Sequence, residues 1–175
     1  MAGDKMTRAW YALHTKSRFE NVVNENLAKK TMDVFLPKIT VKSRRRDRHK
    51  MIRVPLFPGY VFVKTDLNPH EHIEILKTTG AVKLIGSTRG PVPIADATVE
   101  SLRIMVSTEA EVITGTRFKK GDRVMVVNGP FAGVIGLFSS YRGDGRIIVN
   151  IEALGQFAAV NVDAADVEKL PDILS

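Results

Sequence analysis

Residues 42 to 50 form a dense cluster of side chains that bind phosphate. They read Lys-Ser-Arg-Arg-Arg-Asp-Arg-His-Lys, and none of these side chains belongs in a protein core. Arginine and lysine bind phosphate oxygens by charge and hydrogen bonding, without reading base sequence. We therefore predict that this run binds nucleic acid through Arg44, Arg45, Arg46, Arg48 and Lys50. The alternative is a solvated loop without a ligand.

A second group of side chains is aromatic and suits binding to a protein. Phe57, Pro58 and Tyr60 surround Gly59, directly after Pro55 and Leu56. Two prolines and a glycine fix a rigid, irregular backbone, which favours display of the neighbouring rings in an apolar groove. Such a groove suits a helical partner, and aromatic side chains are frequent interface anchors. Core packing is the alternative, and we expect it for Phe62.

Catalytic and metal-binding patterns are weak in comparison. His70 and Glu74 can share one face of a short helix, but two ligands do not make a metal site. We find no phosphate-binding glycine loop with lysine, no cysteine nucleophile and no Gly-x-Ser-x-Gly sequence. We therefore expect a protein without enzymatic activity, metal or cofactor. A hydrolase would need an acid/base pair that the sequence does not supply.

Charge is distributed unevenly along the chain. The 175 residues carry a net charge of +7. Residues 1–64 have 15 Lys and Arg against 5 Asp and Glu, whereas residues 65–175 have 11 against 14. A basic first part favours a polyanionic partner. The absence of cysteine, of a signal peptide and of a long apolar run leads us to expect a cytoplasmic protein that does not enter membranes.

The elements that must position these groups fall into two regions. Strands are expected at 10–15, 34–41, 51–54, 61–64 and 82–85, with the basic run as a hairpin tip. Helices are expected from Ser17, whose spacing to Glu20 is that of a capping box, from Asn68 and from Asp96. Ile73 and Leu76 are expected to form the buried face of the second helix. These elements predict an α+β domain at 9–108, after a disordered segment at 1–8.

The pattern changes beyond the segment 109–116, which is polar and small and which we predict to be a linker. Four short runs of branched apolar residues follow, at 124–127, 134–138, 147–151 and 158–162, with glycine-rich turns between them. This spacing is typical of a small all-β barrel, which we place at 117–171.

Two sequence segments resemble signatures of the NusG family of transcription factors. Residues 56–63, Leu-Phe-Pro-Gly-Tyr-Val-Phe-Val, resemble the central motif of the NGN domain. Residues 120–124 and 129–133, with Gly136, are similar to a KOW motif, and Trp10 to Leu13 resemble the family's first strand. The resemblance covers about Trp10 to Leu170. It implies an NGN domain with an antiparallel sheet flanked by helices, followed by an SH3-like KOW barrel.

The resemblance also implies partners. NGN domains bind the clamp helices of the largest subunit of RNA polymerase, and the residues here that match this surface are Trp10, His14, Phe57, Pro58 and Tyr60. The basic hairpin then lies near upstream duplex DNA or the non-template strand. KOW domains recruit a second partner, which in NusG is the termination factor Rho or a protein of the small ribosomal subunit.

The second domain departs from the general NusG pattern at residues 153–156. These read Ala-Leu-Gly-Gln, where NusG typically has Ile-Phe-Gly-Arg, so Leu154 replaces an aromatic ring and Gln156 a cation. Phe131 is either a plug of the barrel or a contact residue beside them. The departure favours a specialised antitermination paralogue similar to RfaH, with a KOW domain that stays a barrel. A general NusG, or a KOW protein that binds RNA or ribosomes, remains an alternative. We expect a monomer.

Overall fold

The computed structural model divides the chain into two compact units, Met1–Ala95 and Asp96–Ser175. It describes residues 7–44, 50–116, 121–141 and 144–170. The division comes before the third helix, whereas the predicted linker at 109–116 comes after it. Half of the segment that we predict to be a linker is a strand, β9 (Ile113–Thr116).

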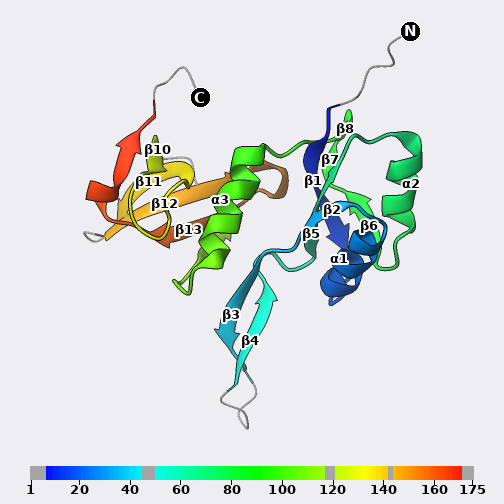
Figure 1. Cartoon of the computed structure of the whole chain (residues 1–175), viewed down its shortest axis with the longest axis horizontal. Coiled ribbons are helices and arrows are strands. Elements are labelled where there is room, and N and C mark those ends of the chain that lie inside the picture. The colour runs from blue at the N-terminus through cyan, green and yellow to red at the C-terminus, as the bar shows by residue number, and fades with distance from the viewer. Residues whose placement is uncertain (1–6, 45–49, 117–120, 142–143, 171–175) are drawn as a thin grey trace. The chain divides into compact units, whose positions relative to one another are not determined.

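The first unit is an α+β domain built on a four-stranded antiparallel sheet (Figure 1). The strand order is β2-β5-β1-β6. Two helices, a two-stranded ribbon and a short two-stranded turn complete the unit. Its elements are β1 (Ala9–Thr15), α1 (Glu20–Lys29), β2 (Asp33–Phe35), β3 (Lys38–Lys42), β4 (Met51–Pro55), β5 (Tyr60–Thr65), α2 (Pro69–Lys77), β6 (Ala81–Leu84), β7 (Gly86–Ser87) and β8 (Gly90–Pro91).

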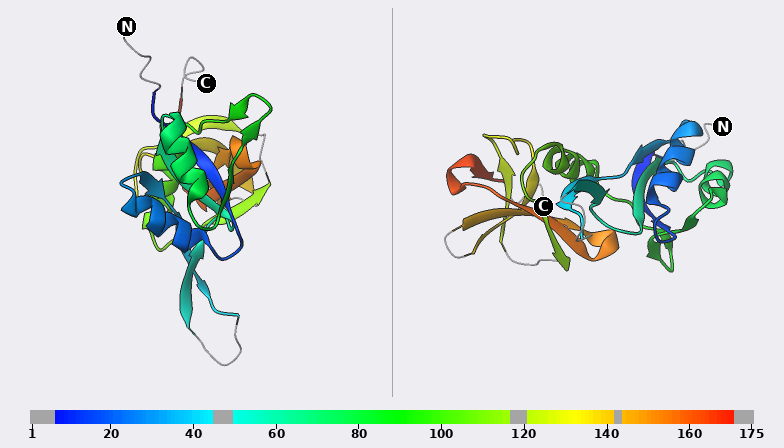
Figure 2. Two further views of the ribbon diagram at one scale, coloured as in Figure 1. Left: turned by 90° about the vertical axis from the view of Figure 1, so that its right-hand side faces the viewer. Right: turned by 90° about the horizontal axis from the view of Figure 1, so that it is seen from below.

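Alternation along the two central strands decides which sheet face the helices cover. Tyr11 and Leu13 of β1 and Val61 and Val63 of β5 point to one face, since alternate residues of a strand share a side. They pack in one apolar cluster with side chains of α1 and α2, namely Val23, Leu27 and Ile75. The two helices therefore lie on the same face of the sheet (Figure 2).

Helix α2 buries a different face from the one that the sequence predicted. Ile75 is fully buried, whereas Ile73 and Leu76 are 51% and 42% exposed. The predicted buried face was therefore wrong. The start of the helix is confirmed, because the side chain of Asn68 accepts a hydrogen bond from the Glu71 N–H, with 2.8 Å between Oδ1 and N.

The predicted strand at 34–41 is interrupted at Pro37, which separates β2 from β3. Proline lacks the N–H that a continuous ladder needs, and its carbonyl instead accepts a bond from the Leu56 N–H at 2.8 Å. The hairpin around the basic run is confirmed, with β3 and β4 paired antiparallel from Lys38↔Pro55 to Lys42↔Met51.

The second unit is a six-stranded antiparallel sheet with one long helix. The strand order is β14-β10-β11-β12-β13-β9, and all four strands expected from the sequence are present. Its elements are α3 (Asp96–Ser107), β9, β10 (Asp122–Val126), β11 (Ile135–Tyr141), β12 (Asp144–Ile151), η1 (Glu152–Leu154), β13 (Gln156–Asn161), η2 (Ala164–Asp166) and β14 (Val167–Lys169).

Helix α3 packs within this second unit. Val99, Leu102 and Met105 are fully buried, and the helix contacts β11 and β12. The buried Ser101 hydroxyl accepts a hydrogen bond from the Ile135 N–H of β11, with 3.0 Å between Oγ and N. The sequence placed α3 with the first domain, because helical periodicity identifies a buried face without identifying what buries it.

The predicted disordered segment at 1–8 lies largely outside the described residues. Arg8 is described and ordered: its guanidinium donates to the Lys64 carbonyl at 3.0 Å and pairs with Glu71 at 3.2 Å. Across the described residues, no helix combines the length and apolar character needed to cross a membrane.

Candidate protein-binding surface

The turn between β4 and β5 is fixed by backbone geometry that its sequence demands. Gly59 has φ +87°, a conformation that side chains disfavour. Its carbonyl accepts a hydrogen bond from the Thr15 N–H of β1 at 2.8 Å, and the Tyr60 N–H donates to the Phe57 carbonyl at 3.2 Å. The turn is thus tied both to itself and to the neighbouring strand.

Glu20 provides a further attachment for this turn. Its Oε1 accepts a hydrogen bond from the Gly59 N–H at 2.8 Å, and the side chain is only 7% exposed. The predicted capping box is therefore wrong: the residue before α1 is Phe19, and no side chain caps the helix. Glu20 begins α1 and binds a turn 39 residues away instead.

The sheet face opposite α1 and α2 carries the predicted polymerase-binding rings. Cross-strand partners share a face, and His14 pairs with Tyr60 at the end of β1 and β5. Their ring centroids lie 5.4 Å apart with planes tilted by 35°, and both side chains are half-buried. Pro58 is exposed beside them. These three residues form the accessible part of the surface, called here the His14–Tyr60 surface.

Phe57 and Trp10 do not contribute exposed rings. Phe57 is 1% exposed and packs edge-on against Phe62, with 6.3 Å between ring centroids, so the expected display of Phe57 is wrong. Trp10 is 6% exposed and lies on the same sheet face, with the Lys64 ammonium 6.0 Å from its ring centroid. The expectation that Phe62 is a core residue is confirmed.

The predicted nucleic-acid-binding residues are described only in part. Arg44 and Lys50 are exposed at the end of the β3–β4 hairpin, where the Ser43 N–H donates to the Lys50 carbonyl at 2.9 Å. Arg45, Arg46 and Arg48 lie outside the described residues.

The predicted contact residues of the second unit differ in exposure. Phe131 is 5% exposed, which agrees with a packing role. Leu154 and Gln156 are half-buried on either side of Gly155, whose φ of +60° ends the short helix η1. Only Leu154 and Gln156 therefore offer accessible side-chain surface here.

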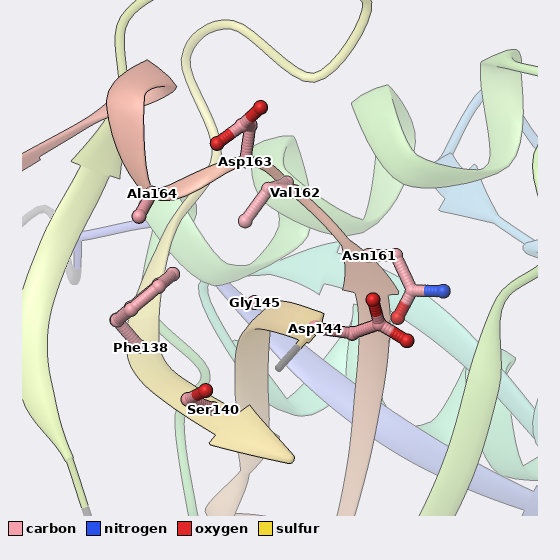
Figure 3. Close-up of a pocket in the computed structure, with 8 residues that line it drawn as sticks. All are labelled: Phe138, Ser140, Asp144, Gly145, Asn161, Val162, Asp163 and Ala164. Atoms are coloured by element: carbon pink, nitrogen blue, oxygen red, sulfur yellow. The ribbon is translucent and has the colours of Figure 1, made fainter. Parts of the chain in front are cut away.

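A hollow of about 510 Å³ lies elsewhere on the second unit (Figure 3). It is lined from β11, β12 and the end of β13, with Asp144 beside Asn161 and Asp163 set apart from both. No sequence pattern predicts this hollow, because the lining residues come from separate strands. Within the described part of the chain, no three His, Cys, Asp or Glu side chains gather as a metal site.

The His70–Glu74 helix turn lines another hollow, of about 750 Å³, in the first unit. Its carboxylates are engaged in ion pairs: Glu71 with Arg8 at 3.2 Å and Glu74 with Lys30 at 3.3 Å. The Lys30 ammonium also donates to the Glu74 carbonyl at 2.9 Å. These groups tie the segments together, which accounts for the charged residues that the sequence grouped there.

Known proteins are similar to this chain over most of its length. A family model described as "Transcription termination factor nusG" matches residues 8–103, more than half of the chain. A relative named transcription termination/antitermination protein NusG, from Thermus thermophilus, is 29% identical and aligns with 94% of this chain and 100% of its own. A relative of the same name from Bacillus subtilis is 25% identical with the same coverage. A solved structure of Thermotoga maritima NusG is 25% identical, with a TM-score of 0.54, and covers 95% of this chain and 99% of its own.

Proposed function

The chain belongs to the NusG family of transcription termination factors, and we propose that it acts during elongation by binding the clamp helices of the largest subunit of RNA polymerase. The single observation that supports this most is the family match over residues 8–103, which includes the whole His14–Tyr60 surface. The relatives are named as transcription factors, and none of those given above is named as an enzyme.

The His14–Tyr60 surface suits a helical tip. The His14 and Tyr60 side chains are in contact with each other and only half-buried, and Pro58 adds exposed apolar surface without conformational freedom. Rigid rings bind with little loss of side-chain entropy, which makes them effective anchors. Trp10 and Phe57 act as buried supports of the sheet and the turn.

The proposed mechanism is selective binding of one polymerase state. A factor that bridges the clamp across the DNA channel keeps the enzyme closed and resists the movement that accompanies pausing. It shifts the equilibrium only by its difference in affinity for the two states, so no catalytic step is required. The basic hairpin contributes contacts with upstream duplex DNA or the non-template strand through Arg44, Lys50 and the arginines between them.

The six-stranded second unit is proposed to be a KOW domain with an SH3-like barrel that recruits a further partner through Leu154 and Gln156. The sequence Ala-Leu-Gly-Gln offers a smaller apolar anchor and no cation. This supports a specialised antitermination paralogue similar to RfaH, with weakened Rho binding.

The test of polymerase binding compares Tyr60→Ala and His14→Ala with Lys29→Ala, an exposed residue on α1, which covers the opposite face of the sheet. Affinity of the full chain for core RNA polymerase is measured by biolayer interferometry. Loss of an interface anchor costs about 2 kcal/mol or more, so we expect the affinity to fall about 30-fold for Tyr60→Ala and to stay unchanged for Lys29→Ala. Wild-type affinity of both ring variants would refute the placement of the site.

A second candidate is the general NusG role, and the printed names of the relatives favour it. Capture of Rho or the small ribosomal subunit from a native lysate, together with polymerase, would support the general factor. Capture of ribosomes without polymerase would instead support a KOW protein that binds RNA or ribosomes.

A further inference from the structure

The β3–β4 ribbon has two chemically different faces. Residues directly opposite each other in an antiparallel pair point to the same side, and the register pairs Thr40 with Arg53 and Val41 with Ile52. Alternation along each strand then assigns every residue to a face. One face is apolar and consists of Ile39, Val41, Ile52 and Val54. The other consists of Lys38, Thr40, Lys42, Met51, Arg53 and Pro55 and is called here the basic ribbon face.

Exposure follows this division. On the basic ribbon face, Thr40, Lys42, Met51 and Arg53 are exposed, and Met51 reaches 58%. On the apolar face only Ile52 is exposed, at 39%. Lys38, Lys42 and Arg53 form no ion pair with any residue in the described ranges of the chain. The basic ribbon face therefore presents three cations, and no acidic side chain lies among its members.

The spacing of these cations fits a nucleic-acid groove. Lys38 and Lys42 are four residues apart on one strand, which corresponds to about 13 Å at the rise of a β-strand. The major groove of B-form DNA is about 12 Å wide and admits a two-stranded ribbon. Arg53 lies between the two lysines, opposite Thr40, where base edges are accessible. Met51, opposite Lys42, adds an apolar side chain of the kind that contacts thymine methyl groups.

Duplex DNA fits this face better than duplex RNA. The major groove of A-form RNA is deep and narrow, so side chains on a ribbon cannot reach its base edges. We propose that the basic ribbon face lies in the major groove of duplex DNA, with Lys38 and Lys42 on the phosphates of opposite walls and Arg53 directed to the floor. This rests on the proposed function in placing the chain near DNA, but it assigns binding to the strands of the ribbon as well as to its tip.

The test measures how salt affects binding of the full chain to a short fluorescein-labelled DNA duplex and to an RNA duplex of the same sequence. The variant carries Lys38→Gln, Lys42→Gln and Arg53→Gln. The matched control carries Lys77→Gln, Lys83→Gln and Arg89→Gln, which removes three exposed cations outside the ribbon. Each lost phosphate contact lowers the magnitude of the log–log salt slope by about 0.9, so loss of the two lysine contacts lowers it by about 1.8.

We expect the fall in slope on DNA for the ribbon variant alone. An unchanged slope overturns the proposal, as does an equal fall for the control variant or on duplex RNA. Should the triple variant fail to fold, Lys38→Gln and Lys42→Gln are tested singly, each with an expected fall of about 0.9. Binding to core polymerase without DNA is measured alongside. If the wild-type protein does not bind core polymerase, the proposed function is contradicted. The salt slopes on duplex DNA still show whether the basic ribbon face binds DNA.

Discussion

The carboxylate of Glu20 accepts a hydrogen bond from the backbone N–H of Gly59, with 2.8 Å between Oε1 and N. Glu20 begins helix α1, and Gly59 lies in the turn that precedes Tyr60. Because the Thr15 N–H donates to the Gly59 carbonyl as well, both backbone polar groups of Gly59 are held. The turn that presents Pro58 and Tyr60 is thus positioned from the start of α1.

Replacement of Glu20 tests this attachment. Glu20→Ala leaves the Gly59 N–H without its partner, which costs about 1 kcal/mol because Gly59 is only half-buried. Glu20→Gln keeps an acceptor oxygen and should retain most of the stability. Urea unfolding followed by fluorescence of Trp10, the single tryptophan, measures both. Equal stability of Glu20→Ala and wild type would contradict this role.

Two glycines with positive φ should respond differently to alanine. At Gly59 an added Cβ has its nearest neighbour at 3.7 Å, on the His14 ring, so only the backbone conformation penalises Gly59→Ala, by about 1–2 kcal/mol. At Gly80 the same atom would lie 2.7 Å from the Phe19 Cβ. We expect Gly80→Ala to lose clearly more stability than Gly59→Ala in the same unfolding assay. The reverse order would show that space around Gly80 does not limit the substitution.

The difference between the predicted and observed roles of Glu20 shows where sequence reasoning fails. Ser17 and Glu20 have the spacing of a capping box, but Arg18 adopts φ +67° and the helix begins only at Glu20. The actual partner of Glu20 is 39 residues distant, and no local pattern reveals such a pair. By contrast, the Asn68 cap and the β3–β4 hairpin depend on neighbouring residues, and both were predicted.

Phe57 was predicted incorrectly for a related reason. Prolines and Gly59 identify an irregular backbone, but they do not decide whether a ring points outward or toward Phe62. The position of His14 beside Tyr60 depended on the family resemblance, because strand pairing between β1 and β5 joins residues 46 positions apart. Only the register of the folded sheet brings them together.

Two isoleucines of α2, one buried and one exposed, allow a direct comparison of the stability lost on substitution by alanine. This helix carries three large apolar residues within four positions, so periodicity alone cannot select the buried one. Ile75→Ala should cost about 2–5 kcal/mol, since it removes a fully buried side chain. Ile73→Ala removes a half-exposed one and should change stability by no more than about 0.5 kcal/mol. Chemical denaturation of the two variants compares them, and equal losses would contradict the observed rotation of the helix.

The start of α2 predicts a pH dependence. The Asn68 backbone N–H binds the Asp66 carboxylate at 3.0 Å, and the Asn68 side-chain amide binds it at 2.7 Å. These bonds, the backbone one first, hold the pKa of Asp66 below its ordinary value of 3.8. A lowered folded-state pKa contributes stability above the ordinary value, and this is lost as the pH falls through the lowered one.

Asp66→Asn should therefore reduce the loss of stability on acidification below pH 3.8. The measurement is urea unfolding at a series of acidic pH values, with Asp33→Asn, an exposed residue on β2, as the control. A variant whose acid profile matches that of wild type would show that the Asp66 bonds do not persist in solution.

Ser101 tests whether α3 packs with the second unit. Its buried hydroxyl accepts the Ile135 N–H at 3.0 Å, and residues on either side of it on α3 are fully buried. Ser101→Ala leaves that N–H unpaired inside the unit and should cost about 1–3 kcal/mol. Ser107→Ala is the control, because the Ser107 hydroxyl is exposed and donates only to Ile104 within the helix, at 2.7 Å.

Hydrogen exchange of the Ile135 amide gives a local readout: it should accelerate in Ser101→Ala and remain slow in Ser107→Ala. Fast exchange at Ile135 in wild type would mean that α3 does not stay on β11, and the predicted boundary after the helix would then be preferred.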